Sequence, residues 1–267
     1  MKKLEDFTTS NRDAWNASAA AFEDTQEWAE MVSKLQQPGF STFDETMTQT
    51  LQDIDIKGRR AVQIGCNNGR ELLSLPSFGA VPGLGIDVSE AFLDQARRLS
   101  DLAGTDCQFL AADIYNLPDE VPDGFELGLI TIGVLNWMPD LPRFFQVVAG
   151  LLSPGAPLVI YETHPFMEMF EPEATDPFAL DRSYFAKEPM SWSETITYDG
   201  SAGKAGPTSY WFTHQLGEIV TACATNGFRI ERLTEHPHSN READYDIYEG
   251  RPAQIPMSYT LVARTMC

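Results

Sequence analysis

Paired cysteines, long apolar runs and an excess of positive charge are all missing from this sequence of 267 residues. The four cysteines are scattered and form no C-x-x-C pair, which predicts buried free thiols in a reducing compartment. The longest apolar stretches, such as residues 129–135, are far shorter than the roughly 20 residues of a membrane span. The charged first six residues lack the apolar segment of a secretory signal, so we expect a cytoplasmic protein with no membrane partner.

Negative charge dominates the composition, with 39 acidic against 19 basic residues and a formal net charge of −20. Such a field repels a phosphate backbone, so we expect no nucleic-acid partner. A neutral or cationic small molecule suits this charge better than an anionic one, although a solubilising charge spread over the surface is the favoured explanation. Histidine is also scarce, and the group His236, His238, Glu235, Glu242 and Asp244 fits no familiar metal motif, so we expect a polar loop and no metal.

Short β-rich runs alternate with helical stretches in the middle of the chain, which is typical of βαβ units in a parallel sheet. The apolar content of 43% supports a globular core. Helices are expected after the capping residues Ser89 and Asp140, and a third is expected to end at Asn226-Gly227. The predicted strands are residues 60–65, 81–88, 107–112, 127–132, 158–162, 228–233 and 258–263, of which the last two suit an antiparallel pair.

The whole chain is predicted to be one domain, with a core over residues 58–163 and a C-terminal part of the sheet over residues 213–267. Residues 1–57 are expected to form a helical cover anchored by Trp15, Phe22 and Trp28. Residues 164–212 are punctuated by proline and glycine and rich in aromatic residues, which favours a substrate lid.

One segment, residues 62–71, carries the clearest functional signal because a strand there ends in a Gly-rich turn that is expected to open a helix. Such a turn lets a ligand approach the backbone closely and faces it with helix N–H groups. Asp87 closes the second strand 22 positions after Gly65, where a carboxylate can accept both hydroxyls of a ribose. Asp113 follows the third strand, where it is placed to accept an adenine amino group, and Gly133 follows the fourth.

Residues 60–165 resemble class I S-adenosylmethionine (SAM)-dependent methyltransferases, especially the branch with ubiquinone- and menaquinone-biosynthesis methyltransferases. The matching motifs are Gly-Ile-Asp-Val-Ser at 85–89, Ala-Asp-Ile-Tyr-Asn-Leu-Pro at 112–118 and Leu-Leu-Ser-Pro-Gly-Ala-Pro-Leu at 151–158. The resemblance implies a Rossmann-like, seven-stranded, mostly parallel sheet with an antiparallel last strand and helices on both faces. It also implies SAM as the cofactor, bound by Gln63, Gly65, Asn67, Gly69, Arg70, Asp87, Val88, Asp113, Ile114 and Gly133.

Two of these residues depart from the family pattern. The family usually has an acidic residue where Gln63 stands, which helps to hold the amino group of the cofactor indirectly. It usually has glycine where Asn67 stands, but asparagine tolerates the left-handed backbone region, so we expect the turn to form. Arg70 is expected either to meet the carboxylate of the cofactor or to be an ordinary surface arginine.

The predicted reaction is O- or N-methylation of a small molecule. A hydroxyl acceptor usually needs a general base, for which His214 is the first candidate and His164 the second, while a structural role remains open for both. Aromatic residues are expected to line the substrate pocket, and they would also suit a cationic amine. The candidates are Trp137, Phe166, Phe185, Trp192, Tyr198 and Trp211.

Two other functions stay open. An NAD-dependent oxidoreductase needs G-x-G-x-x-G, and residues 65–70 fail this fingerprint at the third and sixth positions. A non-catalytic SAM-fold protein that senses a ligand or pairs with a partner is favoured by the altered residues 63 and 67. The sequence indicates neither the substrate nor the oligomeric state.

Overall fold

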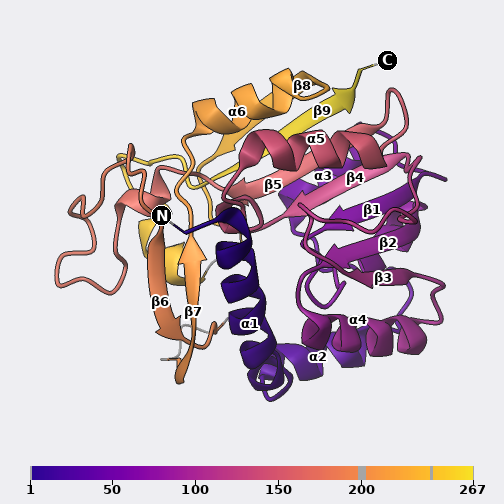
Figure 1. Ribbon diagram of the computed structural model, residues 1–267, viewed down its shortest axis with the longest axis horizontal. Coiled ribbons are helices and arrows are strands. Elements are labelled where there is room, and N and C mark those ends of the chain that lie inside the picture. Colours follow the sequence, from indigo (N-terminus) through magenta and orange to yellow (C-terminus); the bar gives the residue numbers. More distant parts are fainter. Residues whose placement is uncertain (1, 198–202, 241–242, 267) are drawn as a thin grey trace.

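The sheet has the seven strands that the sequence predicts, in the order β3-β2-β1-β4-β5-β9-β8 (Figure 1). Strand β9 alone runs antiparallel to both of its neighbours, β5 and β8. The computed structural model describes residues 2–197, 203–240 and 243–266. The strands of this sheet are β1 (Arg60–Ile64), β2 (Val81–Asp87), β3 (Gln108–Ala111), β4 (Leu127–Thr131), β5 (Pro157–Thr163), β8 (Phe228–His236) and β9 (Ser258–Thr265).

Both predicted capping residues begin helices. The side chain of Ser89 accepts a hydrogen bond from the backbone of Phe92, and that of Asp140 accepts one from Arg143. The α-helices are α1 (Leu4–Glu23), α2 (Gln26–Lys34), α3 (Glu45–Asp53), α4 (Glu90–Ala103), α5 (Leu141–Leu151) and α6 (Leu216–Thr225). The described residues also contain four short 3₁₀ helices: η1 (Leu72–Phe78), η2 (Leu135–Trp137), η3 (Met167–Met169) and η4 (Ala243–Tyr248).

Helices cover both faces of the sheet. On one face, Val62 and Ile64 of β1 belong to a core cluster that includes buried residues of α5 and α6. On the other face, Ala61 packs in a cluster with residues of α3 and η1. This alternation follows from the two-residue period of a strand, and it explains why β1 is apolar on both sides.

The element after the Gly-rich turn differs from the sequence prediction of an ordinary helix starting near Arg70. It is the 3₁₀ helix η1, which begins at Leu72 and contains Pro76. Proline has no backbone N–H and crowds the preceding turn, so this segment cannot continue as an α-helix.

The expected lid contains a two-stranded antiparallel hairpin, β6 (Met190–Glu194) and β7 (Ala205–Trp211), that the sequence did not reveal. Helix α1 stands between this hairpin and the main sheet (Figure 1). The side chain of Asn11 fixes α1 to β7: its Nδ2 donates to the Tyr210 carbonyl at 3.0 Å, and its Oδ1 accepts from the Tyr210 N–H at 2.7 Å. Within the described residues, no helix has both the length and the apolar character that crossing a membrane requires.

Candidate functional site

A cavity of about 280 Å³ opens at the carboxyl ends of β1, β2, β3 and β4. From β1 the chain first adds β2 and β3 on one side and then β4 and β5 on the other, so the strand order reverses at β1. Open α/β sheets bind ligands at such a switch point. Helix α1 and the hairpin supply the opposite walls. The lining includes Thr8, Trp15, Gly65, Asn67, Arg70, Glu71, Asp87, Asp113, Gly133, Trp137, Trp211, Asn240 and Asp244.

The Gly-rich turn brings the backbone to the cavity as predicted. Gly65 has φ +64°, and a Cβ there would lie 2.6 Å from Cγ2 of Val134, so no other residue fits without a shift. Asn67 adopts φ 51°, which confirms that asparagine holds the left-handed conformation in this turn. The turn is therefore formed despite its departure from the family pattern.

Asp87 is anchored by the backbone of the same turn. Its Oδ2 accepts from the N–H of Asn67 at 2.7 Å, and its Oδ1 accepts from the N–H of Ser89 at 2.8 Å. Burial raises the pKa of the Asp87 carboxyl, and these backbone bonds oppose the rise. A carboxylate has about four acceptor positions, so Asp87 keeps acceptor capacity for hydroxyls of a ligand.

Asp113 follows β3 on the neighbouring wall of the cavity. Its Oδ1 accepts from the N–H of Tyr115 at 3.0 Å, and its Oδ2 accepts from the hydroxyl of Thr8 at 2.7 Å. The apolar side chains of Val88 and Ile114 lie in the lining between the two carboxylates. A planar base with an exocyclic amino group suits this combination of apolar walls and an acceptor.

The end of β4 carries an unusual backbone. Ile132 has φ 27° and Gly133 has φ 85°, and a positive φ at a β-branched residue is a strained conformation. The buried carboxylate of Glu162 holds this bend, because it accepts hydrogen bonds from the N–H groups of Gly133 and Leu135. Backbone strain of this kind concentrates at functional sites, which supports the cofactor-binding role expected for Gly133.

The structure brings most of the predicted cofactor residues to the cavity, with two exceptions. Gln63 lies behind the lining, where its Nε2 donates to Oγ1 of Thr131 at 3.1 Å. Gly69 also lies outside the lining, and a Cβ there would meet the Phe109 ring at 2.8 Å, so its place is one of packing. The predicted cofactor residues that do line the cavity are Gly65, Asn67, Arg70, Asp87, Val88, Asp113, Ile114 and Gly133.

Tryptophans form one wall of the cavity. Trp137 stands between Trp15 and Trp211, with ring centroids 5.2 and 4.9 Å apart in edge-to-face contacts. Nε1 of Trp211 donates to Glu168 at 3.0 Å, which fixes the orientation of that ring. Of the other predicted aromatic residues, Phe166, Phe185 and Trp192 lie outside the lining, and Tyr198 falls outside the described residues.

Neither candidate histidine lines the cavity. Nε2 of His214 donates to the Met138 carbonyl at 2.8 Å. Nδ1 of His164 accepts from the N–H of Phe166, so its Nε2 carries the proton and bonds to Glu235 at 2.9 Å. Burial lowers the pKa of both rings. These hydrogen bonds indicate a structural role for both histidines.

The predicted polar loop contains no metal-binding arrangement among the residues that the structure describes, and Glu242 lies outside them. His236 belongs to β8, and its Nε2 is 3.1 Å from Oγ1 of Thr260. Its neighbour His238 contacts Oγ1 of Thr46 through Nε2 at 2.9 Å.

Sequence reasoning missed several lining residues that come from distant parts of the chain. Thr8, Asn240 and Asp244 reach the cavity without belonging to a recognisable motif, and Glu71 reaches it from the end of the Gly-rich segment, where no role was assigned to it. Asn240 is fully buried, and its Oδ1 accepts from the Thr163 hydroxyl at 3.0 Å. The sequence did indicate Trp15 as an apolar anchor of the N-terminal helices. Its position in the cavity wall could not be predicted, because it depends on where α1 packs.

A family model described as a methyltransferase domain matches residues 61–155. The methyltransferase phqN of Penicillium fellutanum is 28% identical over 200 residues, covering 75% of this chain and 51% of that protein. The ubiquinone biosynthesis O-methyltransferase of Coxiella burnetii is 29% identical over 108 residues, covering 40% of this chain and 44% of that protein. The chain therefore spans about half the length of these relatives.

A solved SAM-dependent methyltransferase from Mesorhizobium loti has the same fold as this chain. Its TM-score is 0.59, with 24% identity, and the match covers 81% of this chain and 96% of that one. The sheet order and the single antiparallel strand β9 agree with this result. These matches confirm the Rossmann-like fold that the sequence predicted.

Proposed function

We propose that this chain transfers a methyl group from SAM to an oxygen or nitrogen atom of a small molecule bound against the tryptophan wall. The observation that supports this most is the shared cavity. Asp87 and Asp113 line it on the β2 and β3 side, while Trp137 and Trp211 line it near the end of β4. A donor and an acceptor held in one cavity gain the effective concentration that a two-substrate reaction needs.

The donor set fits SAM in three parts. Asp87 would accept the ribose hydroxyls, and Asp113 would accept the adenine amino group in place of the Thr8 hydroxyl. The Gly65 turn gives the methionine end close access to the backbone. When bound, SAM supplies a methyl group on a sulfonium centre, which an in-line nucleophile accepts.

The charge of the cavity favours neutral or cationic acceptors over anionic ones. Arg70 is the single basic side chain in its described lining, and no lysine reaches it. Tryptophan faces attract cations through their quadrupole, so an amine-bearing aromatic compound would suit both features. The Coxiella relative is named as an O-methyltransferase, which supports an oxygen acceptor as the second possibility. The lining carboxylates are Glu27, Glu71, Asp87, Asp113 and Asp244.

The proposed transfer depends on the orientation of the acceptor relative to the methyl group and uses no histidine base. His214 and His164 are each engaged in hydrogen bonds away from the cavity. An amine that binds with a free lone pair needs only to be aligned with the methyl group. Nδ2 of Asn240 is buried at the cavity and has no hydrogen-bond partner among the described residues, so it is placed to bind an oxygen of the acceptor.

A methyl-transfer assay over a panel of amines, phenols and carboxylic acids, read by mass spectrometry, tests this function. We expect turnover with neutral or cationic ring compounds and a raised KM for the acceptor in Trp211→Ala. Phe185→Ala is the control, because that ring is 67% exposed and outside the cavity. Binding of S-adenosylhomocysteine without turnover on any compound would instead favour a non-catalytic SAM-fold protein.

A further inference from the structure

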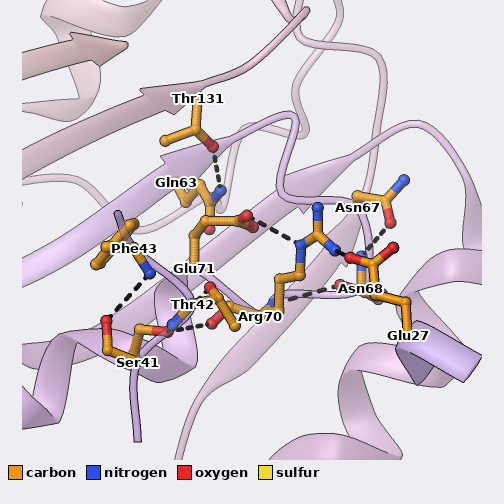
Figure 2. A network of polar contacts seen from close by, with 11 residues as sticks. Glu27, Ser41, Thr42, Phe43, Gln63, Asn67, Asn68, Arg70, Glu71 and Thr131 are labelled. Carbon is orange, nitrogen blue, oxygen red and sulfur yellow. Dashed lines mark hydrogen bonds and ion pairs between the residues drawn. The ribbon is translucent and has the colours of Figure 1, made fainter. Parts of the chain in front are cut away.

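A charged cluster lines the cavity beside the Gly-rich turn. Figure 2 shows the guanidinium of Arg70 between the carboxylates of Glu71 and Glu27. Nε of Arg70 bonds to Oε1 of Glu71 at 3.0 Å, and Nη1 of Arg70 bonds to Glu27. The side chain of Glu71 is only 8% exposed, against 52% for Glu27. The buried member of the cluster is therefore a carboxylate next to a ligand cavity.

The strand residue beneath this cluster contributes no charge. Gln63 is 1% exposed, and its Nε2 is directed to Thr131. Its Oε1 has no hydrogen-bond partner among the described residues, and Gln63 does not line the cavity. Glu71 and the more exposed Glu27 are the acidic side chains of the cluster that reach the cavity.

Among the described residues, the guanidinium of Arg70 pairs with the carboxylates of both Glu27 and Glu71. A buried carboxylate needs a partner of opposite charge or hydrogen-bond donors. The exposed Glu27 is the weaker partner of Arg70, because solvent screens an exposed ion pair. A ligand that brings both an ammonium and a carboxylate would complement Glu71 and Arg70 together.

We propose that Glu71 binds the α-ammonium group of the SAM methionine moiety and that Arg70 binds its carboxylate. This inference rests on the proposed function, since it concerns the same cavity. It assigns the cationic group of the cofactor to the residue just before η1, and not to the strand residue Gln63. Glu71 and Arg70 are adjacent in sequence, so one short segment recognises both charges of the amino acid.

Calorimetric titration with two ligands tests this assignment. S-adenosylhomocysteine contains the amino-acid group, whereas 5′-methylthioadenosine has the same nucleoside and sulfur without it. In Glu71→Gln we expect the affinity for S-adenosylhomocysteine to fall by about 10- to 100-fold, because a charge-assisted hydrogen bond is lost, while 5′-methylthioadenosine binds as before. Glu71→Asp keeps the charge and should lie between the wild type and Glu71→Gln.

The ratio of the two affinities stays informative for a variant that folds poorly, because partial unfolding lowers the apparent affinity for both ligands equally. Glu90→Gln is the control: Glu90 pairs with Arg97 on the surface and lies outside the cavity, so its ratio should equal that of the wild type. An unchanged ratio in Glu71→Gln would overturn the assignment. Failure of the wild type to bind either ligand would instead contradict the proposed function.

Discussion

Replacing Asp87 by asparagine alters a carboxylate whose two oxygens both accept hydrogen bonds from the backbone. Its two oxygens accept from the N–H groups of Asn67 and Ser89 at 2.7 and 2.8 Å. An amide has one oxygen, so its NH₂ group must face either a backbone N–H or a ribose hydroxyl. The variant therefore loses both the charge and half of the acceptor positions.

The size of the effect follows from the two ribose hydroxyls. A hydrogen bond to a charged group contributes about 1.5–3 kcal/mol, and one to a neutral group about 0.5–1.5 kcal/mol. Weakening one such bond and losing the other gives a net loss of about 2–4 kcal/mol, which is an increase in Kd of about 30- to 700-fold. Both SAM and 5′-methylthioadenosine contain the ribose, so Asp87→Asn should weaken them alike.

Calorimetry of the variant with these two ligands measures this loss, and a melting curve by circular dichroism checks that it is folded. Acid should act like the substitution, because burial raises the pKa of Asp87 and protonation begins at a higher pH than for an ordinary carboxyl. Affinity for nucleoside ligands is therefore expected to fall as the pH is lowered through that pKa. A folded Asp87→Asn protein with wild-type affinity would refute the assignment of Asp87 to the ribose.

Three further predictions concern stability. Gly65→Ala forces a Cβ to within 2.6 Å of Val134 at a left-handed φ, and should lower the free energy of unfolding in urea by about 2–4 kcal/mol; a smaller loss than 1 kcal/mol would mean that the turn is pliable. Phe145→Ala empties a fully buried position and should cost about 3–5 kcal/mol, seen as a lower melting temperature. Burial lowers the pKa values of His164 and His214, so the stability they contribute is present above pH 6.5 and is lost as the pH falls through their folded pKa values; a melting temperature that rises on acidification from pH 7 would contradict this.

The sheet was predictable because its strands are defined by local pattern. Short β-rich runs predicted all seven strands, and Ser89 and Asp140 predicted two helix starts. The hairpin of β6 and β7 was not predictable in this way. Its strand β6 is mostly exposed and polar, and it pairs only with β7 in the described chain, so no apolar alternation marks it.

The side of the cavity formed by the ends of β2, β3 and β4 was predictable because its residues follow strands. Asp87, Asp113 and Gly133 meet there because parallel strands end at one edge of the sheet. The opposite side of the cavity depends on tertiary packing. Thr8 and Asn240 reach the cavity only because α1 and the loop after β8 fold over it, and no local pattern in the sequence encodes that approach.

Titration of the unmodified protein with SAM, S-adenosylhomocysteine and NAD in parallel tests the central claim most directly. The account predicts saturable binding of the first two at one site per chain and no binding of NAD. Binding of NAD in preference to SAM, or no binding of either sulfur nucleoside, would contradict it.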